Sequence, residues 1–293
     1  MSKTWSIILL IVLVILLILV STFFGFLMVN GGKFPFNFQI GGYSDKLVES
    51  KTVESANIIN VDVNSSDVFV EHSTDDKISV ELYSDFDVEH EITYNNNELF
   101  IKMEQKPHIV IGIHKSNKVV IKVPESFDKD FVIKTTTGDI NMETYENANV
   151  EIEVRTGDIK VQNLNELKVT DKTGDIEVNY VKKADLKTTT GDVEIINVDT
   201  LTVKVTTGDI KVDTINNNFT IEGDTGSVRI STANVLDDSS IDVKTGDVKI
   251  NSLTGAFIEA ETSTGDIKIN NNDRKLEKTC TIKTTTGDIR VNQ

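Results

Sequence analysis

Aspartates recur at regular intervals in the C-terminal half of the sequence, each directly after a Thr-Gly pair. They are Asp139, Asp158, Asp175, Asp192, Asp209, Asp247, Asp266 and Asp288, with Ser227 in the equivalent place of the sixth motif. A column of such carboxylates could bind calcium, which prefers oxygen ligands. Carboxylates that converge on a cleft could also cleave a polysaccharide. A third interpretation is structural, because an aspartate side chain hydrogen-bonds readily to the backbone of a turn.

Other residues that could do chemistry are few. The four histidines, His72, His90, His108 and His114, precede the repeats, and their spacing does not match a zinc site. Cys280 is the single cysteine, which excludes an intramolecular disulfide and a multi-cysteine metal site. It stands seven residues before Gly287, where other repeats carry apolar residues, and is therefore predicted to be a buried thiol. The sequence predicts no catalytic residue, no metal ligand and no cofactor.

The elements that position the aspartates follow from the repeat. The nine motif glycines, 17–22 residues apart, are Gly138, Gly157, Gly174, Gly191, Gly208, Gly226, Gly246, Gly265 and Gly287. The residues five before, two after and four after each glycine are apolar in every repeat, and those between them are mostly polar. Alternation with a period of two predicts two short strands per repeat, each with one buried face.

A unit of 17 residues cannot bury its apolar face alone, so the repeats must stack. In layers about 4.8 Å apart, neighbouring repeats would pair as parallel strands around one core. The strong turn signal occurs once per repeat, which disfavours an array of hairpins. The sequence therefore predicts an all-β solenoid with nine regular Thr-Gly-Asp repeats over residues 131–293.

Stacking favours turn chemistry for the aspartates. Two unit charges one layer apart repel by only about 0.9 kcal/mol in water, and a hydrogen bond to the turn backbone offsets a similar amount. Six of the nine residues two places beyond the aspartate position are Lys or Arg, on the same outward face. Calcium solenoids built on glycine and aspartate use a nine-residue double-glycine repeat, which this sequence lacks. Calcium bound by the column is kept as the alternative.

The motif residues before the aspartate are predicted to build the corner of each layer. Glycine suits a corner with positive φ, which side chains disfavour. The preceding threonine has the same parity as the buried positions, so we expect its methyl group to pack inward and its hydroxyl to bond to the corner backbone. These threonines are Thr137, Thr156, Thr173, Thr190, Thr207, Thr225, Thr245, Thr264 and Thr286.

Residues 51–130 are predicted to form an irregular cap at the start of the same stack. Val61, Val63, Val68 and Val70 flank Ser65-Ser66-Asp67, which matches the repeat with serine in place of threonine and glycine. Strands are also expected around Ile78–Leu82 and Val119–Val123, with a hairpin turn at Tyr94–Leu99. The chain stops soon after Asp288, so its last repeat is predicted to leave an open, uncapped edge where a partner could dock.

The N-terminus reads as a membrane anchor. Residues 7–29 carry no charge and are nearly all Ile, Leu, Val or Phe, long enough to span a bilayer as one helix. No small-residue cleavage site follows, which disfavours a signal peptide. Lys3 precedes the span, so residues 1–6 are predicted to be a cytoplasmic tail. Residues 30–50 then form a juxtamembrane linker, and residues 51–293 an extracytoplasmic solenoid.

The overall charge limits the partners. The formal net charge is −16, with 46 acidic and 30 basic residues. Nucleic-acid binding is disfavoured, because it depends on clustered Lys and Arg. We expect a membrane partner through the N-terminal helix, together with a cell-wall polymer, a lipid-linked precursor or an envelope protein.

The order of these segments resembles a bacterial family of "putative adhesin" proteins that includes LiaG-like membrane proteins. The likeness rests on the anchor, the Asp62–Val70 strand pair, the Val119–Pro124 strand and the tandem Thr-Gly-Asp repeats, and it covers roughly residues 50–293. It implies a right-handed, single-stranded β-helix at the cell envelope, and it supplies no catalytic residue.

Together these observations favour a non-enzymatic, membrane-anchored binding scaffold of the cell envelope. Two alternatives stay open: a calcium-stabilised surface structure that uses the aspartate column, and an enzyme that acts on polysaccharide.

Overall fold

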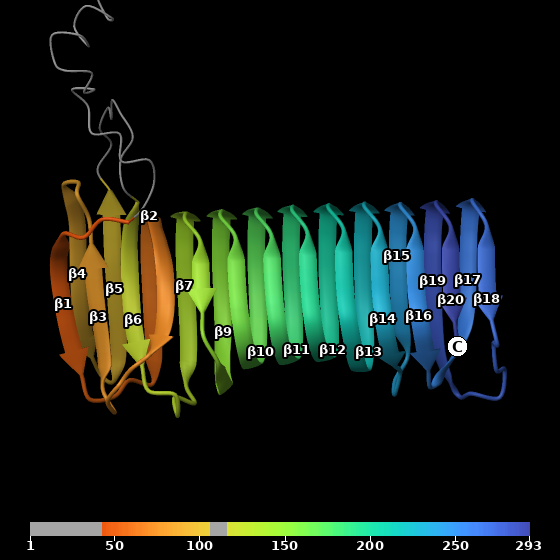
Figure 1. Ribbon diagram of the computed structural model, residues 1–293, viewed down its shortest axis with the longest axis horizontal. Helices are drawn as coiled ribbons and strands as arrows, with labels where there is room; N and C mark the ends of the chain where they lie inside the picture. The colour runs from red at the N-terminus through yellow and green to blue at the C-terminus, as the bar shows by residue number, and fades with distance from the viewer. Residues whose placement is uncertain (1–42, 106–115) are drawn as a thin grey trace, which may run out of the picture. The chain divides into compact units, whose positions relative to one another are not determined.

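The computed structural model describes residues 43–105 and 116–293, and within these ranges all helical or extended structure is β (Figure 1). These two ranges contain no helix that could cross a membrane. The predicted tail, residues 1–6, and the predicted span, residues 7–29, lie outside the described residues, as does most of the linker. The predicted all-β solenoid is confirmed for the part that the structure describes.

Parallel strands, stacked in register, form the regular part of the solenoid. Their bounds are β7 Asp130–Thr137, β8 Ile140–Met142, β9 Tyr145–Thr156, β10 Ile159–Thr173, β11 Ile176–Thr190, β12 Val193–Thr207, β13 Ile210–Thr225, β14 Val228–Asn234, β15 Ser239–Thr245 and β16 Val248–Thr254. Equivalent residues of successive repeats are partners, as in Ile159, Ile176 and Val193. We call one turn of the chain, from corner glycine to corner glycine, a layer.

The core is a set of apolar columns that run through these layers. In β11, for example, Ile176, Val178, Val181, Ala184 and Leu186 are buried, and the residues between them are exposed or half-buried. Isoleucine and valine suit this arrangement because branched side chains pack well on a pleated surface. Each layer therefore covers the apolar side chains of the next.

The N-terminal end of the stack contains the antiparallel strands. Their bounds and those of their neighbours are β1 Leu47–Val53, β2 Ile58–His72, β3 Ile78–Tyr83, β4 Val88–Asn95, β5 Glu98–Gln105 and β6 Asn117–Val123. β2 lies between β7–β8 on one side and β5–β6 on the other, always in parallel. β3 and β4 pair with β6 and β5 in antiparallel fashion.

The strands expected in this irregular part are present. β2 contains the predicted strand pair, and Ser65 lies opposite Thr137 in the register. The hairpin turn between β4 and β5 lies at Asn96 and Asn97, both with positive φ. Asparagine tolerates this conformation better than most residues, which explains the turn.

The C-terminal layers do not stack in sequence order. Their strands are β17 Ala256–Thr264, β18 Ile267–Asn270, β19 Lys278–Thr286 and β20 Ile289–Asn292. β19 lies between β15 and β17, and β20 lies between β16 and β18 (Figure 1). The last repeat of the chain, β19–β20, is thus inserted between the two repeats that precede it in the sequence. As a result, β17–β18 form the outermost layer.

The prediction that the last repeat forms the open edge was therefore wrong. Inside the stack, Cys280, Ile282 and Ile289 are covered on both sides and fully buried. The outermost layer has Ala260 where its neighbours have larger residues, and Ile267 there is 45% exposed. The layer that contributes the smaller apolar side chain thus lies at the end of the stack, where side chains are covered on one side only. The expectation of a buried Cys280 agrees with its position.

Candidate functional site

The corner glycines are fixed by contact between layers. Gly191 has a φ of 143°, and a Cβ atom there would lie 1.9 Å from the carbonyl oxygen of Gly174. Eight of the nine corner glycines donate their N–H to the carbonyl of the motif threonine in the next layer, as from Gly174 to Thr190 at 3.0 Å; Gly265 belongs to the outermost layer. The backbones approach so closely that only glycine fits.

The aspartate that follows each glycine bonds to the adjacent layer. Asp175 Oδ1 accepts a hydrogen bond from the backbone N–H of Asp192 at 2.8 Å, and Asp192 Oδ1 accepts one from Asp209 at 2.7 Å. The same bond recurs from Asp67 to Asp209 and again among Asp247, Asp288 and Asp266. The aspartates do serve the corner, but they join two layers instead of closing their own turn as we expected.

Cations neutralise this column at only some layers. Arg229 Nη1 lies 2.9 Å from Asp209 Oδ2, and Arg290 pairs with Asp288. Lys160 and Lys211 instead pair with glutamates of neighbouring layers. Among the described residues, no three His, Cys, Asp or Glu side chains are grouped so that they could hold one metal ion.

The motif threonines point away from the core. All nine are exposed, so the predicted inward packing was wrong. The alternation of buried and exposed side chains stops where the chain turns at the corner. The last side chain that points into the core belongs to the residue two places before the motif threonine. Thr135, Thr188 and Thr284 occupy this buried column, and Thr284 Oγ1 donates to the carbonyl of Gly246 at 3.2 Å.

The same column holds a buried carboxylate, Asp171. Its neighbours in the column are Val154 and Thr188, and its side chain is 2% exposed. Thr188 Oγ1 donates to Asp171 Oδ2 at 3.1 Å, and the Thr173 N–H donates to Oδ1 at 3.2 Å. Burial raises the pKa of Asp171 to about 6, because the ionised form loses solvation. Sequence reasoning did not single out this residue, although valine at the same place in other repeats marks the position as internal.

Replacing Asp171 by asparagine should remove a pH dependence of stability. The folded-state pKa lies above the usual value near 4, so the stability that protonation provides is present below pH 4 and lost as the pH rises through 6. We expect Asp171→Asn to be more stable than the wild type by on the order of 2 kcal/mol at pH 7.5. At pH 4 the two proteins should be nearly equal. Urea unfolding across this range measures the difference, and a constant difference at all pH values would contradict the assignment.

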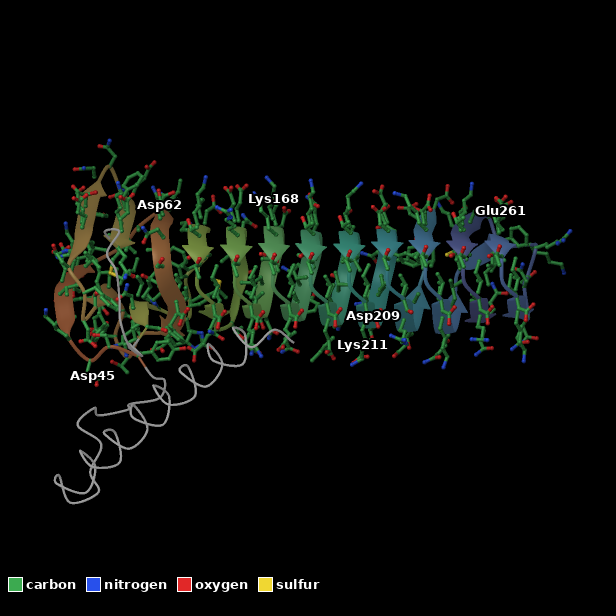
Figure 2. The ribbon with its side chains drawn as sticks, turned by 90° about the horizontal axis from the view of Figure 1, so that it is seen from above. Asp45, Asp62, Lys168, Asp209, Lys211 and Glu261 are labelled. Carbon is green, nitrogen blue, oxygen red and sulfur yellow. The ribbon has the colours of Figure 1, made fainter. Side chains whose placement is uncertain are left out.

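The two faces of the stack carry different side chains. Figure 2 shows Lys168 and Glu261 on one side of the layers, and Asp209 and Lys211 on the opposite side. The first side, which we call the pre-corner face, is formed by the strand segments that precede the corner glycines. Ion pairs link its layers, including Lys168 with Glu151 at 2.8 Å and Lys204 with Glu222 at 2.6 Å.

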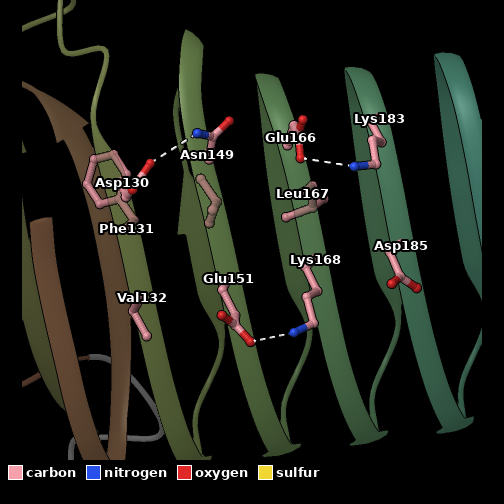
Figure 3. Close-up of a pocket in the computed structure, with 11 residues that line it drawn as sticks. Asp130, Phe131, Val132, Asn149, Glu151, Glu166, Leu167, Lys168, Lys183 and Asp185 are labelled. Carbon is pink, nitrogen blue, oxygen red and sulfur yellow. Dashed lines mark hydrogen bonds and ion pairs between the residues drawn. The ribbon is translucent and has the colours of Figure 1, made fainter.

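A shallow groove of about 340 Å³ crosses the pre-corner face over β7, β9, β10 and β11 (Figure 3). Four carboxylates line it: Asp130, Glu151, Glu166 and Asp185. Glu151 and Glu166 form ion pairs with Lys168 and Lys183, and Asp130 accepts a hydrogen bond from Asn149. These partners are on neighbouring layers, so the groove is lined by a mixed-charge ladder and not by carboxylates converging on one point.

Comparison with known proteins identifies the family. The family model described as Toastrack DUF4097 matches residues 56–235 and 196–293. The chain belongs to this family. The match covers the irregular layers around β2 as well as the regular repeats, so the Toastrack region includes both parts of the described solenoid.

Solved structures with low sequence identity are also similar to this Toastrack chain. A "putative adhesin" from Bacteroides fragilis is 15% identical, covers 87% of this chain and 100% of its own, and has a TM-score of 0.43. A "putative adhesin" from Parabacteroides merdae is 15% identical, with 85% and 98% covered and a TM-score of 0.42. A "putative lipid binding protein" from Parabacteroides distasonis is 15% identical, with 86% and 99% covered and a TM-score of 0.39. No curated protein matches the chain.

Proposed function

We propose that this Toastrack protein is a non-enzymatic, adhesin-like binding scaffold of the bacterial cell envelope. Residues 7–29 would anchor it as a single helix, with residues 1–6 in the cytoplasm and the solenoid, wound in a right-handed sense, outside. The uncharged sequence of residues 7–29 supports the anchor, because its length suits the apolar core of a bilayer. Its partner would be a cell-wall polymer, a lipid-linked precursor or an envelope protein.

The observation that carries the proposal is the repetition of outward side chains along the stack. Parallel pairing places the same motif position of each layer in one column, as for the exposed Thr173, Thr190 and Thr207. Successive layers then present the same kind of group along such a column about every 4.8 Å. A partner with a repeating unit can contact many layers at once, and several weak contacts then add to a useful affinity.

Binding by the full-length chain tests the proposal. We would reconstitute the protein in lipid vesicles and measure co-sedimentation with purified cell-wall polymer, using vesicles without protein as the control. Saturable retention of the loaded vesicles is expected, together with unchanged polymer length after prolonged incubation. Shortening of the polymer chains would contradict the non-enzymatic role. Equal retention of loaded and empty vesicles by every envelope fraction tried would contradict the binding role.

A further inference from the structure

The edge of the stack between its two faces carries an unusual concentration of uncharged polar side chains. Here the alternation of buried and exposed side chains is interrupted midway between corners, and we call this edge of β10 to β13 the amide side. Its residues include Asn163, Asn179, Tyr180, Ile196, Asn197 and Asn216. The pre-corner face, by contrast, is linked by repeated ion pairs.

Hydrogen bonds between layers hold these amides in fixed orientations. Asn179 Nδ2 donates to Asn163 Oδ1 at 3.0 Å, and Asn216 Nδ2 donates to Asn197 Oδ1 at 2.9 Å. A side-chain amide has two N–H groups and two acceptor positions on its oxygen. The bonds within the ladder use only part of this capacity, and the half-buried side chains keep access to solvent. The remaining donors and acceptors are therefore pre-oriented for a ligand.

An apolar side chain lies next to these groups along the chain. Ile196 is 51% exposed and directly precedes Asn197. The register places Tyr180 opposite Asn197 on the next layer. Exposed isoleucine in a strand interior has no role in the core, but it can cover an apolar part of a ligand.

One carboxylate joins the cluster. Asp199 Oδ1 accepts a hydrogen bond from Asn216 at 2.9 Å, and its Oδ2 accepts one from the Tyr180 hydroxyl at 3.3 Å. Burial and the nearby Asp199 charge raise the pKa of Tyr180, so its hydroxyl keeps its proton at neutral pH. Together the residues offer acceptors, donors and an apolar surface within four adjacent layers, β10 to β13.

We propose that the amide side binds an uncharged glycan strand that lies along the stack. Sugar rings combine vicinal hydroxyls, which amides and carboxylates bind, with C–H faces that pack on apolar side chains. The layer spacing of about 4.8 Å is close to the length of one sugar unit in an extended β-linked glycan. An anionic polymer fits less well, because Asp199 lies at the centre of the cluster and the chain is acidic overall. This inference rests on the proposed binding function and names the class of its partner.

The test uses the full-length protein in vesicles and a soluble β-linked N-acetylglucosamine oligomer as the probe. We expect saturable binding that Ile196→Asp weakens at least tenfold, because the charge removes the apolar contact. Asn216→Ala should weaken binding by a similar factor. Leu47→Asp is the matched control, since Leu47 is also an exposed apolar residue, at 50%, and lies in β1, away from β10 to β13; its affinity should equal that of the wild type.

Thermal unfolding of each variant separates lost binding from lost folding. Ile196→Asp should unfold at nearly the wild-type temperature because its side chain is exposed, so this variant decides the result even if Asn216→Ala is unstable. Absence of oligomer binding, or equal binding by wild type and Ile196→Asp, would overturn the glycan assignment. If cell-wall polymer still retains the vesicles in that case, the proposed function stands and only the amide side is refuted. Stronger binding of polyphosphate than of the neutral oligomer would also overturn it.

Discussion

Replacing Gly191 by alanine is expected to destabilise the solenoid by on the order of 4 kcal/mol. The φ of 143° at this corner is strained for any residue with a side chain, at a cost of about 1–3 kcal/mol. The new Cβ would also lie 1.9 Å from the carbonyl oxygen of Gly174, so two layers would have to separate. Forced backbone shifts of this kind cost about another 1–3 kcal/mol. Urea unfolding followed by circular dichroism measures the sum.

Gly223 provides the matched control for this substitution. It belongs to the same stack, but a Cβ there would meet only the Val243 methyl groups, at 3.5 and 3.8 Å. These are ordinary contacts, so Gly223→Ala should change the free energy of unfolding by less than about 1 kcal/mol. Equal losses for the two alanine variants would show that close stacking of the corners does not determine the requirement for glycine.

Ile289→Ala should cost about 3 kcal/mol, whereas Ile267→Ala should cost less than about 1 kcal/mol. Both isoleucines stand two residues after a corner glycine and pair with each other across β18 and β20. Ile289 is fully buried between two layers, and its truncation leaves a cavity. Ile267 is 45% exposed in the outermost layer, so less apolar area is lost from it.

The same unfolding assay compares these two variants. If the layers stacked in sequence order, Ile289 would lie at the end and the ranking of the two losses would be reversed. A larger loss for Ile267→Ala than for Ile289→Ala would therefore contradict the inserted position of β19–β20.

Much of the fold could be predicted because the same residue types recur at the same positions of every repeat. Apolar residues at fixed distances from each glycine indicate the strands and their buried sides. Even the degenerate Ser65-Ser66-Asp67 corner was recognisable, because Asp67 keeps the acceptor that bonds to the Asp139 backbone. These features are local, so one sequence is sufficient to reveal them.

The order of the last layers could not be predicted, because every repeat presents nearly the same columns to its neighbours. Any of them can stack on any other, and only Ala260 distinguishes the outer layer. The outward threonines were missed for a different reason. The alternation of inward and outward side chains along a strand, extended to Thr190, predicts that this threonine points inward. The chain has already begun to turn at that residue, so the alternation no longer holds there.

The amide side was also hidden from sequence reasoning. Its asparagines stand at three different distances from the preceding corner glycines, so alignment on the glycines does not bring them all into one column: Asn179 is five residues after its glycine, Asn163 and Asn197 are six, and Asn216 is eight. Asn179 and Asn163 bond although they stand at different distances from their glycines. Hydrogen bonds between neighbouring layers bring these amides together.

The order of the layers determines which side chains share a column or a face of the stack. Disulfide cross-linking tests this order most directly. Lys249 and Arg290 are outward partners in adjacent layers, whereas Lys268 lies one layer further out, beyond Arg290. Adjacent parallel strands place Cα atoms within the range of a disulfide, and residues two layers apart exceed it. Cys280 is buried and its thiol pKa is raised to about 12, so it should not compete.

We therefore predict that the double variant Lys249→Cys, Arg290→Cys forms a disulfide on mild oxidation, seen by mass spectrometry of unreduced peptides. The double variant Lys249→Cys, Lys268→Cys should stay reduced under the same conditions. The reverse result, with a disulfide only in the second variant, would contradict the stacking order and the surfaces derived from it.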